Sequence, residues 1–167
     1  MKRHIAVTAA ALIALAAFTG CADKSSSDIA ASKSEYKKLI EQYVNDGWAQ
    51  SEEHFQLAYF LYDMDKDGVP ELFTRSGVYG EIDGDEGFKI AVCTFRDGEA
   101  VVAADGIDGG HTYLGVDAGA KQVVLCRAHD GVGSFTWLEM AADGGVTEAK
   151  TSDEFTFRST DDEGQKN

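Results

Sequence analysis

The chain has 167 residues, a length that fits one ordinary domain and excludes large multidomain machinery. It carries 29 Asp and Glu residues against 15 Lys and Arg residues, for a formal charge of −14 at pH 7. Because nucleic-acid binding needs clustered cations that neutralise phosphates, this balance argues against a nucleic-acid partner. The hydrophobic content of 44% is enough to fill a core, so wholesale disorder is excluded as well.

The first 20 residues have the features of an export signal. A cationic start with Lys2 and Arg3 precedes a predominantly apolar run over residues 5–18. A permanent membrane span needs about 20 apolar residues, so we expect this shorter run to be cleaved off.

The four residues at the end of that run, 18–21, read Phe-Thr-Gly-Cys and resemble the lipobox of bacterial lipoproteins. The resemblance implies that residues 1–20 are a lipoprotein signal peptide and that Cys21 receives a diacylglyceryl group. Phe18 departs from the Leu that is usual in this family. Ordinary signal cleavage after Ala22 is therefore the alternative.

Both processing routes place the domain outside the cytoplasm. With the lipid, two or three acyl chains anchor the chain stably at the outer face of the cell membrane, and without it the domain is secreted. Residues 21–34 are rich in serine and predict a flexible tether. We then expect a single domain over residues 35–160 and a disordered polar tail over residues 161–167.

Residues 34–46 predict an N-terminal helix, because apolar side chains recur there at spacings of three and four. The residues of this apolar face are Tyr36, Leu39, Ile40, Tyr43 and Val44. The sequence Asn-Asp-Gly at 45–47 predicts the end of the helix.

The rest of the chain has the pattern of short β-strands. Candidates lie at residues 88–95, 99–103, 111–116, 121–128, 134–140, 145–149 and 154–158. Asp-Gly pairs at 97–98, 130–131 and 143–144 predict hairpin turns, because this dipeptide tolerates positive φ. We therefore predict an α+β fold in which the N-terminal helix packs on an antiparallel β-meander sheet of six to eight strands.

One motif with recognisable chemistry lies at residues 63–71, which read Asp-Met-Asp-Lys-Asp-Gly-Val-Pro-Glu. Alternate side chains of a tight loop turn toward one point, and Ca²⁺ prefers six to eight oxygen ligands. Four carboxylates packed together without a cation would repel one another. The sequence therefore predicts a structural Ca²⁺ site, and the alternative is an acidic hairpin turn that binds no ion.

The pattern resembles the Asp-x-Asp-x-Asp-Gly loops of FG-GAP repeats and of EF-hand-like proteins. It departs from a true EF-hand because Thr74 replaces the bidentate Glu and Pro70 lacks an amide hydrogen. The resemblance implies ligation by the side chains of Asp63, Asp65, Asp67 and Glu71 and by the carbonyl of Val69. It also favours strands over residues 55–62 and 71–76, where a helix is the alternative for the first segment. Residues 60–72 are similar to a segment of uncharacterised lipoproteins from Gram-positive bacteria.

Two further sets of residues are candidates for functional roles. Cys93 and Cys126 lie in predicted strands, and in an oxidising compartment they suggest one disulfide, with two buried free thiols as the alternative. Tyr113 and Trp137 would form a binding surface for a sugar ring or a protein if they are exposed, and core if they are buried. His111 follows two glycines and would then rim a cleft.

These observations favour a noncatalytic, membrane-anchored extracytoplasmic module that binds a protein, a glycan or the cell wall and carries a Ca²⁺ loop. The module is favoured because the sequence contains no assembled catalytic motif. The alternative is an extracellular hydrolase or cell-wall-modifying enzyme with a dispersed site that includes His111, His129 and Asp130.

Overall fold

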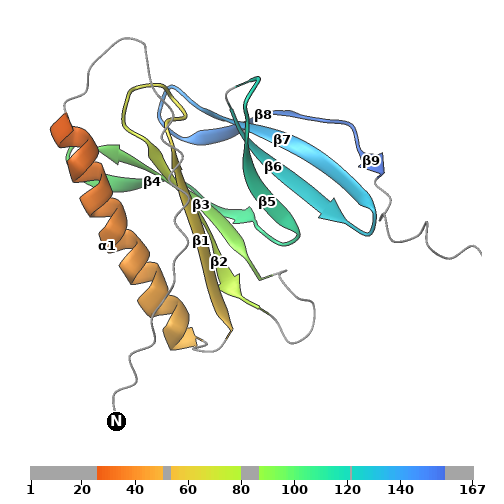
Figure 1. Cartoon of the computed structure of the whole chain (residues 1–167), viewed down its shortest axis with the longest axis horizontal. Coiled ribbons are helices and arrows are strands. Elements are labelled where there is room, and N and C mark those ends of the chain that lie inside the picture. Colours follow the sequence, from red (N-terminus) through yellow and green to blue (C-terminus); the bar gives the residue numbers. More distant parts are fainter. Residues whose placement is uncertain (1–25, 51–53, 80–86, 121, 157–167) are drawn as a thin grey trace, which may run out of the picture.

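The computed structural model describes residues 26–50, 54–79, 87–120 and 122–156, with one helix and two antiparallel sheets in these ranges (Figure 1). The elements are α1 (Ser26–Gln50), β1 (Phe55–Tyr62), β2 (Glu71–Val78), β3 (Lys89–Arg96), β4 (Glu99–Asp108), β5 (Thr112–Asp117), β6 (Gln122–His129), β7 (Val132–Met140), β8 (Val146–Thr151) and β9 (Phe155–Thr156). The first sheet has the order β1-β2-β3-β4. The second has the order β5-β6-β7-β8, and β9 pairs with β7.

The α+β class is confirmed, as is the meander in which each strand pairs with its neighbour along the chain. The expectation of one sheet with six to eight strands is wrong, because the chain leaves the first sheet at Gly109. The Gly109 amide donates to the carbonyl of Phe88 at 2.9 Å, and a Cβ on Gly109 would lie 3.0 Å from the Phe88 backbone. Arg75 Nε donates to the Gly109 carbonyl at 2.8 Å. The backbone pairing between β3 and β4 therefore extends to Phe88 and Gly109, and β5 of the second sheet begins at Thr112.

The helix is longer at both ends than the sequence predicts. It begins at Ser26, so residues 26–34 are helical and are not the expected flexible tether. The buried Ser32 belongs to the inward face of this part of the helix, and its hydroxyl donates to the carbonyl of Ile29. Because this buried residue is polar, the spacing of apolar residues did not predict the first turns of the helix. Gly47 does not end the helix; the ring of Phe55 occupies the space where a side chain at Gly47 would lie. Within the described residues, no helix has the length and apolar character needed to cross a membrane.

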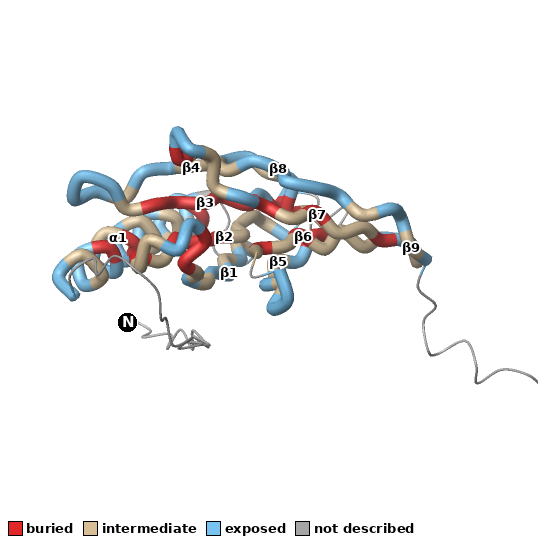
Figure 2. The backbone as a smooth tube through the Cα atoms, turned by 90° about the horizontal axis from the view of Figure 1, so that it is seen from above, coloured by how far each residue is buried: buried red, intermediate tan, exposed pale blue. Residues whose placement is uncertain are grey.

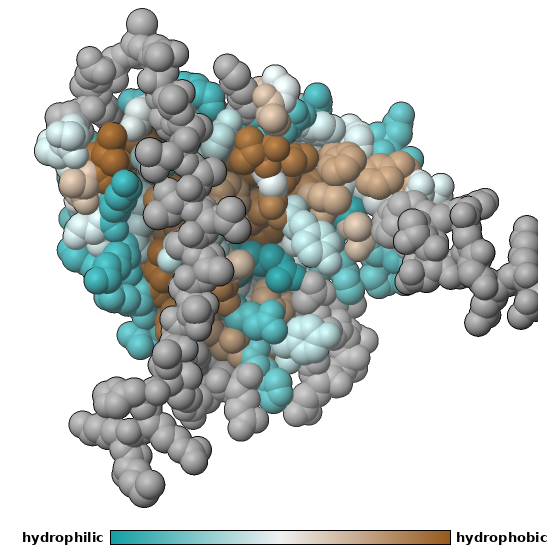
Figure 3. All heavy atoms as spheres, viewed as in Figure 1, coloured by the Kyte–Doolittle hydropathy of each residue, from teal (hydrophilic) through white to brown (hydrophobic). Residues whose placement is uncertain are grey.

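The first sheet is apolar on both faces, because successive side chains of a strand point to opposite sides. Leu72 and Cys93 pack with Tyr36 of α1 on one face, and Phe73 and Val92 lie on the other face, in the core shared with the second sheet. The other buried members of that shared core are Met64, Ile90, Val123, Leu125 and Leu138. Figure 2 shows the buried backbone concentrated in β2, β3, β6 and β7, and Figure 3 shows a band of apolar residues beside the hydrophilic side chains of the helix.

The strands and two of the expected hairpin turns agree with the sequence pattern. Asp97 and Gly98 have φ values of 52° and 89°, and Asp130 and Gly131 have values of 50° and 79°. Positive φ at both central residues is the geometry of a two-residue hairpin turn that matches the strand twist. The β3–β4 and β6–β7 hairpins therefore follow from local sequence alone.

Candidate functional site

The acidic loop at residues 63–70 joins β1 to β2. The two strands pair in register as far as Tyr62 and Glu71, so the loop is the end of an antiparallel hairpin. The first flanking segment is thus a strand, as the FG-GAP resemblance implies, and the helical alternative is wrong. Lys66 and Gly68 have φ values of 64° and 91°, and these left-handed residues fold the loop back on itself.

Three carboxylates converge inside this loop. One carboxylate oxygen from each of Asp63, Asp65 and Glu71 lies within 4.8 Å of the others. Asp63 and Glu71 are buried, with exposed fractions of 2% and 1%, whereas Asp65 is open to solvent. Burial raises the pKa of Glu71 to about 8 and also raises the pKa of Asp63 above its usual value. Without a cation, Glu71 is therefore mostly neutral near pH 7, and burial makes the ionised form of Asp63 less favourable than that of an exposed aspartate.

Backbone amides hold the carboxylates in this inward orientation. Glu71 Oε2 accepts a hydrogen bond from the Met64 amide at 2.7 Å. Asp63 Oδ1 and Oδ2 accept from the amides of Asp67 and Gly68 at 3.1 and 3.2 Å. Because these bonds fix the two buried side chains, the loop is preorganised to present oxygen atoms to one point.

Asp67, a further expected ligand, is arranged differently. The Asp67 carboxylate accepts a hydrogen bond from the Val69 amide at 2.8 Å and is not part of the group of three. The Val69 side chain is buried. The converging set consists only of carboxylate oxygens, which suit hard cations such as Ca²⁺ better than soft ones. The structure thus brings together three of the four carboxylates that the sequence singled out.

The helix contributes a buried tyrosine that sequence reasoning assigned only to the apolar face. The Tyr36 residue is 2% exposed, and its hydroxyl has no hydrogen-bond partner among the described residues. Burial raises the Tyr36 pKa well above its usual value, and the negative charge of Glu71 raises it further. No pattern in the sequence could have shown that this hydroxyl lacks a partner.

The two strand cysteines are both free. Cys93 lies on the face of the first sheet that contacts α1. Cys126 follows Leu125 in β6; because Leu125 points into the core between the sheets, Cys126 points to the outer face of the second sheet. The two thiols therefore lie on opposite sides of the intersheet core, which explains why this pair forms no disulfide.

Tyr113 and Trp137 lie on the same outer face of the second sheet. Tyr113 pairs across the strands with Cys126, and Cys126 pairs with Phe135, two residues before Trp137. The Tyr113 residue is 64% exposed and the Trp137 side chain is partly exposed. The Trp137 ring is held in place, because Nε1 donates to Asp117 Oδ2 at 2.8 Å. The face is therefore open to solvent and carries aromatic rings.

His111 lies at the other end of β5 from Asp117. It lines an open pocket of about 310 Å³ together with His129 and Arg127. The centroids of the two imidazole rings are 4.3 Å apart. The sequence indicates this proximity, because His111 lies at the start of one strand and His129 at the end of the next. The start of one strand and the end of the next meet in an antiparallel meander.

Comparisons with protein-family models, with curated proteins and with solved structures gave no match for this chain. Three expected features lie outside the described residues: the signal peptide at residues 1–20, lipidation at Cys21 and the polar tail at residues 161–167.

Proposed function

We propose that this chain is a lipid-anchored, noncatalytic extracytoplasmic binding module whose first hairpin is stabilised by Ca²⁺. The observation that supports the ion best is the convergence of Asp63, Asp65 and Glu71 within 4.8 Å, with two of the three carboxylates almost fully buried. Burying an ionised carboxylate is costly unless it is paired or coordinates a metal. A divalent cation would offset that cost for all three groups at once.

In this proposal the ion has a structural role. The side chains of Asp63, Asp65 and Glu71 would hold it, and Asp67 and Val69 lie in the same loop. When bound, Ca²⁺ supplies positive charge that lets the carboxylates remain ionised side by side. Because the loop joins β1 and β2, the ion would stabilise the edge hairpin of the first sheet.

Calcium titration of the purified full chain tests the ion. We expect a saturable heat of binding and a rise in the thermal midpoint, since a ligand selective for the folded state stabilises it. Asp65→Asn should abolish both effects, and Asp153→Asn, an exposed carboxylate outside the loop, should leave them unchanged. Absence of heat and of a midpoint shift at about 10 mM Ca²⁺, above the range of weak extracellular sites, would refute the calcium proposal.

The membrane anchor has a separate test. If Cys21 carries the lipid, the natural chain labels with fatty acid in a bacterial host and sediments with membranes, whereas Cys21→Ser does neither. Equal labelling and sedimentation of the two chains would contradict the anchor.

The outer face of the second sheet is the binding surface in this proposal, and its ligand is a protein, a glycan or a cell-wall polymer. The exposure of Tyr113 and the fixed ring of Trp137 support this choice. In a screen of glycans and wall polymers, any specific signal should fall in Tyr113→Ala. Tyr79→Ala is the matched control, because Tyr79 is also exposed but follows β2 of the first sheet. Loss of the signal in both variants or in neither would place the ligand elsewhere.

A further inference from the structure

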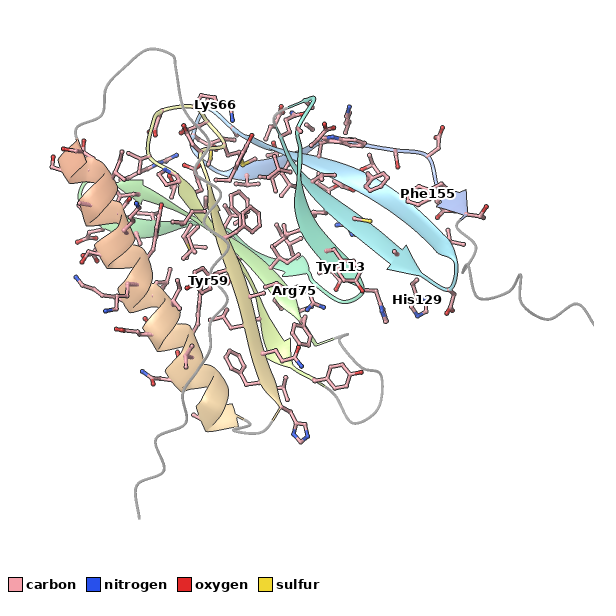
Figure 4. The ribbon with its side chains drawn as sticks, in the orientation of Figure 1. Tyr59, Lys66, Arg75, Tyr113, His129 and Phe155 are labelled. Atoms are coloured by element: carbon pink, nitrogen blue, oxygen red, sulfur yellow. The ribbon has the colours of Figure 1, made fainter. Side chains whose placement is uncertain are left out.

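A pair of histidines lies at the opposite end of the fold from the acidic loop. His111 immediately precedes β5 and His129 ends β6, and the amide of Ala128 donates to the carbonyl of His111 at 3.0 Å. Figure 4 shows Lys66 of the acidic loop at one edge of the molecule and His129 at a distant edge. The histidine pair is thus separate from the proposed Ca²⁺ site.

The two imidazoles are arranged as neighbours around one space. Their ring centroids are 4.3 Å apart and the ring planes are tilted by 49°, so the rings are not stacked in parallel. Both residues line the open pocket of about 310 Å³. His111 reaches this position with a φ of 48°, a left-handed conformation that is uncommon for a residue other than glycine. Such a backbone is retained where the surrounding structure determines it, and it concentrates at functional sites.

The charges around the pair favour a cation. His129 Nδ1 lies 3.3 Å from Asp130 Oδ2, and a carboxylate at one ring nitrogen orients the imidazole and leaves the other nitrogen available. Glu154 also lines the pocket. The guanidinium of Arg127, which lines the pocket too, is engaged on the β7 and β8 side: Nη1 donates to Thr136 at 2.8 Å, and Nη2 lies 3.5 Å from Glu148.

We propose that His111 and His129 form a binding site for a divalent transition-metal ion, with Zn²⁺ as the representative. Imidazole nitrogen is the commonest protein ligand for ions of this class and is a poor ligand for Ca²⁺, so the chain would carry two sites of different selectivity. Asp130 is a positioning residue that orients His129. Two histidines leave coordination positions for water, for Glu154 or for an external ligand, so the site is open.

Zinc titration of the full chain tests this proposal, with about 5 mM Ca²⁺ present throughout so that the acidic loop does not contribute. We expect one Zn²⁺ per chain, and His111→Gln and His129→Gln should each weaken binding by at least about tenfold. His54→Gln is the matched control, because His54 is an exposed histidine that precedes β1, and it should leave the affinity unchanged. Circular dichroism of each variant establishes that it has folded.

A second measurement needs no variant. Paramagnetic Ni²⁺ added to the unaltered chain should broaden the imidazole NMR signals of His111 and His129 before that of His54. Unchanged zinc affinity in both glutamine variants would overturn the proposal, as would equal broadening of the His54, His111 and His129 signals. Zinc binding that disappears only in Asp65→Asn would assign the ion to the acidic loop and would also overturn it. If the Ca²⁺ site fails its own test, the same zinc titration is made in the Asp65→Asn background, and the losses expected for His111→Gln and His129→Gln remain unchanged.

Discussion

Replacement of Glu71 by Gln should stabilise the protein in the absence of metal and abolish its stabilisation by Ca²⁺. The Glu71 residue is 1% exposed, and its pKa is about 8 in the folded chain against an ordinary value of 4.5. Near pH 7 the unfolded chain therefore has an ionised carboxylate, whereas the folded chain holds a proton. Across the interval from 4.5 to 7, at about 1.4 kcal/mol per pH unit, this difference lowers the free energy of unfolding by about 3 kcal/mol.

Glutamine removes this penalty and keeps the shape of the side chain. Its oxygen can still accept the hydrogen bond from the Met64 amide, and small shifts would let its amide group donate to Asp63 or Asp65, whose carboxylate oxygens lie within 4.8 Å of a Glu71 carboxylate oxygen. Reorganisation of these contacts reduces the gain, so we expect Glu71→Gln to be more stable than the unaltered chain by about 1–3 kcal/mol at pH 7 in EDTA.

The dependence on pH has a defined sign. Because the pKa of Glu71 is higher in the folded chain than in the unfolded chain, the protonated side chain contributes stability that is fully present below pH 4.5. This contribution is lost as the pH rises through about 8. The unaltered chain in EDTA should therefore lose stability between pH 5 and about 8. The Glu71→Gln chain should not show that loss, and the two unfolding curves should converge near pH 4.

Urea unfolding in EDTA and in Ca²⁺, at several pH values, measures both effects. Calcium at 10 to 100 times its dissociation constant should add about 1.4–2.7 kcal/mol to the unaltered chain and nothing to the variant. The reasoning is refuted if Glu71→Gln is the less stable protein in EDTA at pH 7. Calcium stabilisation that survives in the variant would equally exclude Glu71 as a ligand.

Two further predictions concern the framework of the fold. Gly109→Ala should lower the free energy of unfolding by about 1–3 kcal/mol in urea titrations, because the added Cβ would lie 3.0 Å from the Phe88 backbone; an unchanged midpoint would contradict this account of the junction between the sheets. Burial raises the pKa of Cys93 to about 11 and that of Tyr43 to about 12. The stability that the protonated thiol and hydroxyl contribute is therefore complete below pH 9, and it is lost as the pH rises through the two folded-state pKa values. The thermal midpoint should accordingly fall at alkaline pH, and the fall should be smaller in Cys93→Ala.

Local features of the fold could be read from the sequence because they depend on short-range chemistry. Turns such as Asp97–Gly98 need positive φ, and the dipeptide shows this directly. The division into two sheets could not be read in this way. The first sheet ends where Gly109 meets Phe88, and these two residues are separated by two strands of the chain, so short-range sequence patterns do not determine where that end falls.

The candidate site was partly predictable for the same reason. The carboxylates of the acidic loop are close in sequence, so spacing alone brought Asp63 and Asp65 together with Glu71. The burial of Glu71, and the lack of a partner for the Tyr36 hydroxyl in the described part of the chain, depend on how the helix and the sheets pack, which periodicity does not determine. The tether expected over residues 21–34 is helical from Ser26 onward, and the buried Ser32 in this part of the helix gives no hydrophobic signal.

The order of the strands has a consequence for how the chain folds. Apart from β9, each strand pairs with strands adjacent to it in the sequence, and no strand of one sheet pairs with a strand of the other among the described residues. Hairpins built from such local contacts form quickly, because little loop-closure entropy is lost. Each sheet can therefore assemble independently, and we expect the slow step to be the collapse that brings Phe73 and Leu125 into one core. The few residues between β4 and β5 would then act as the hinge of the folding reaction.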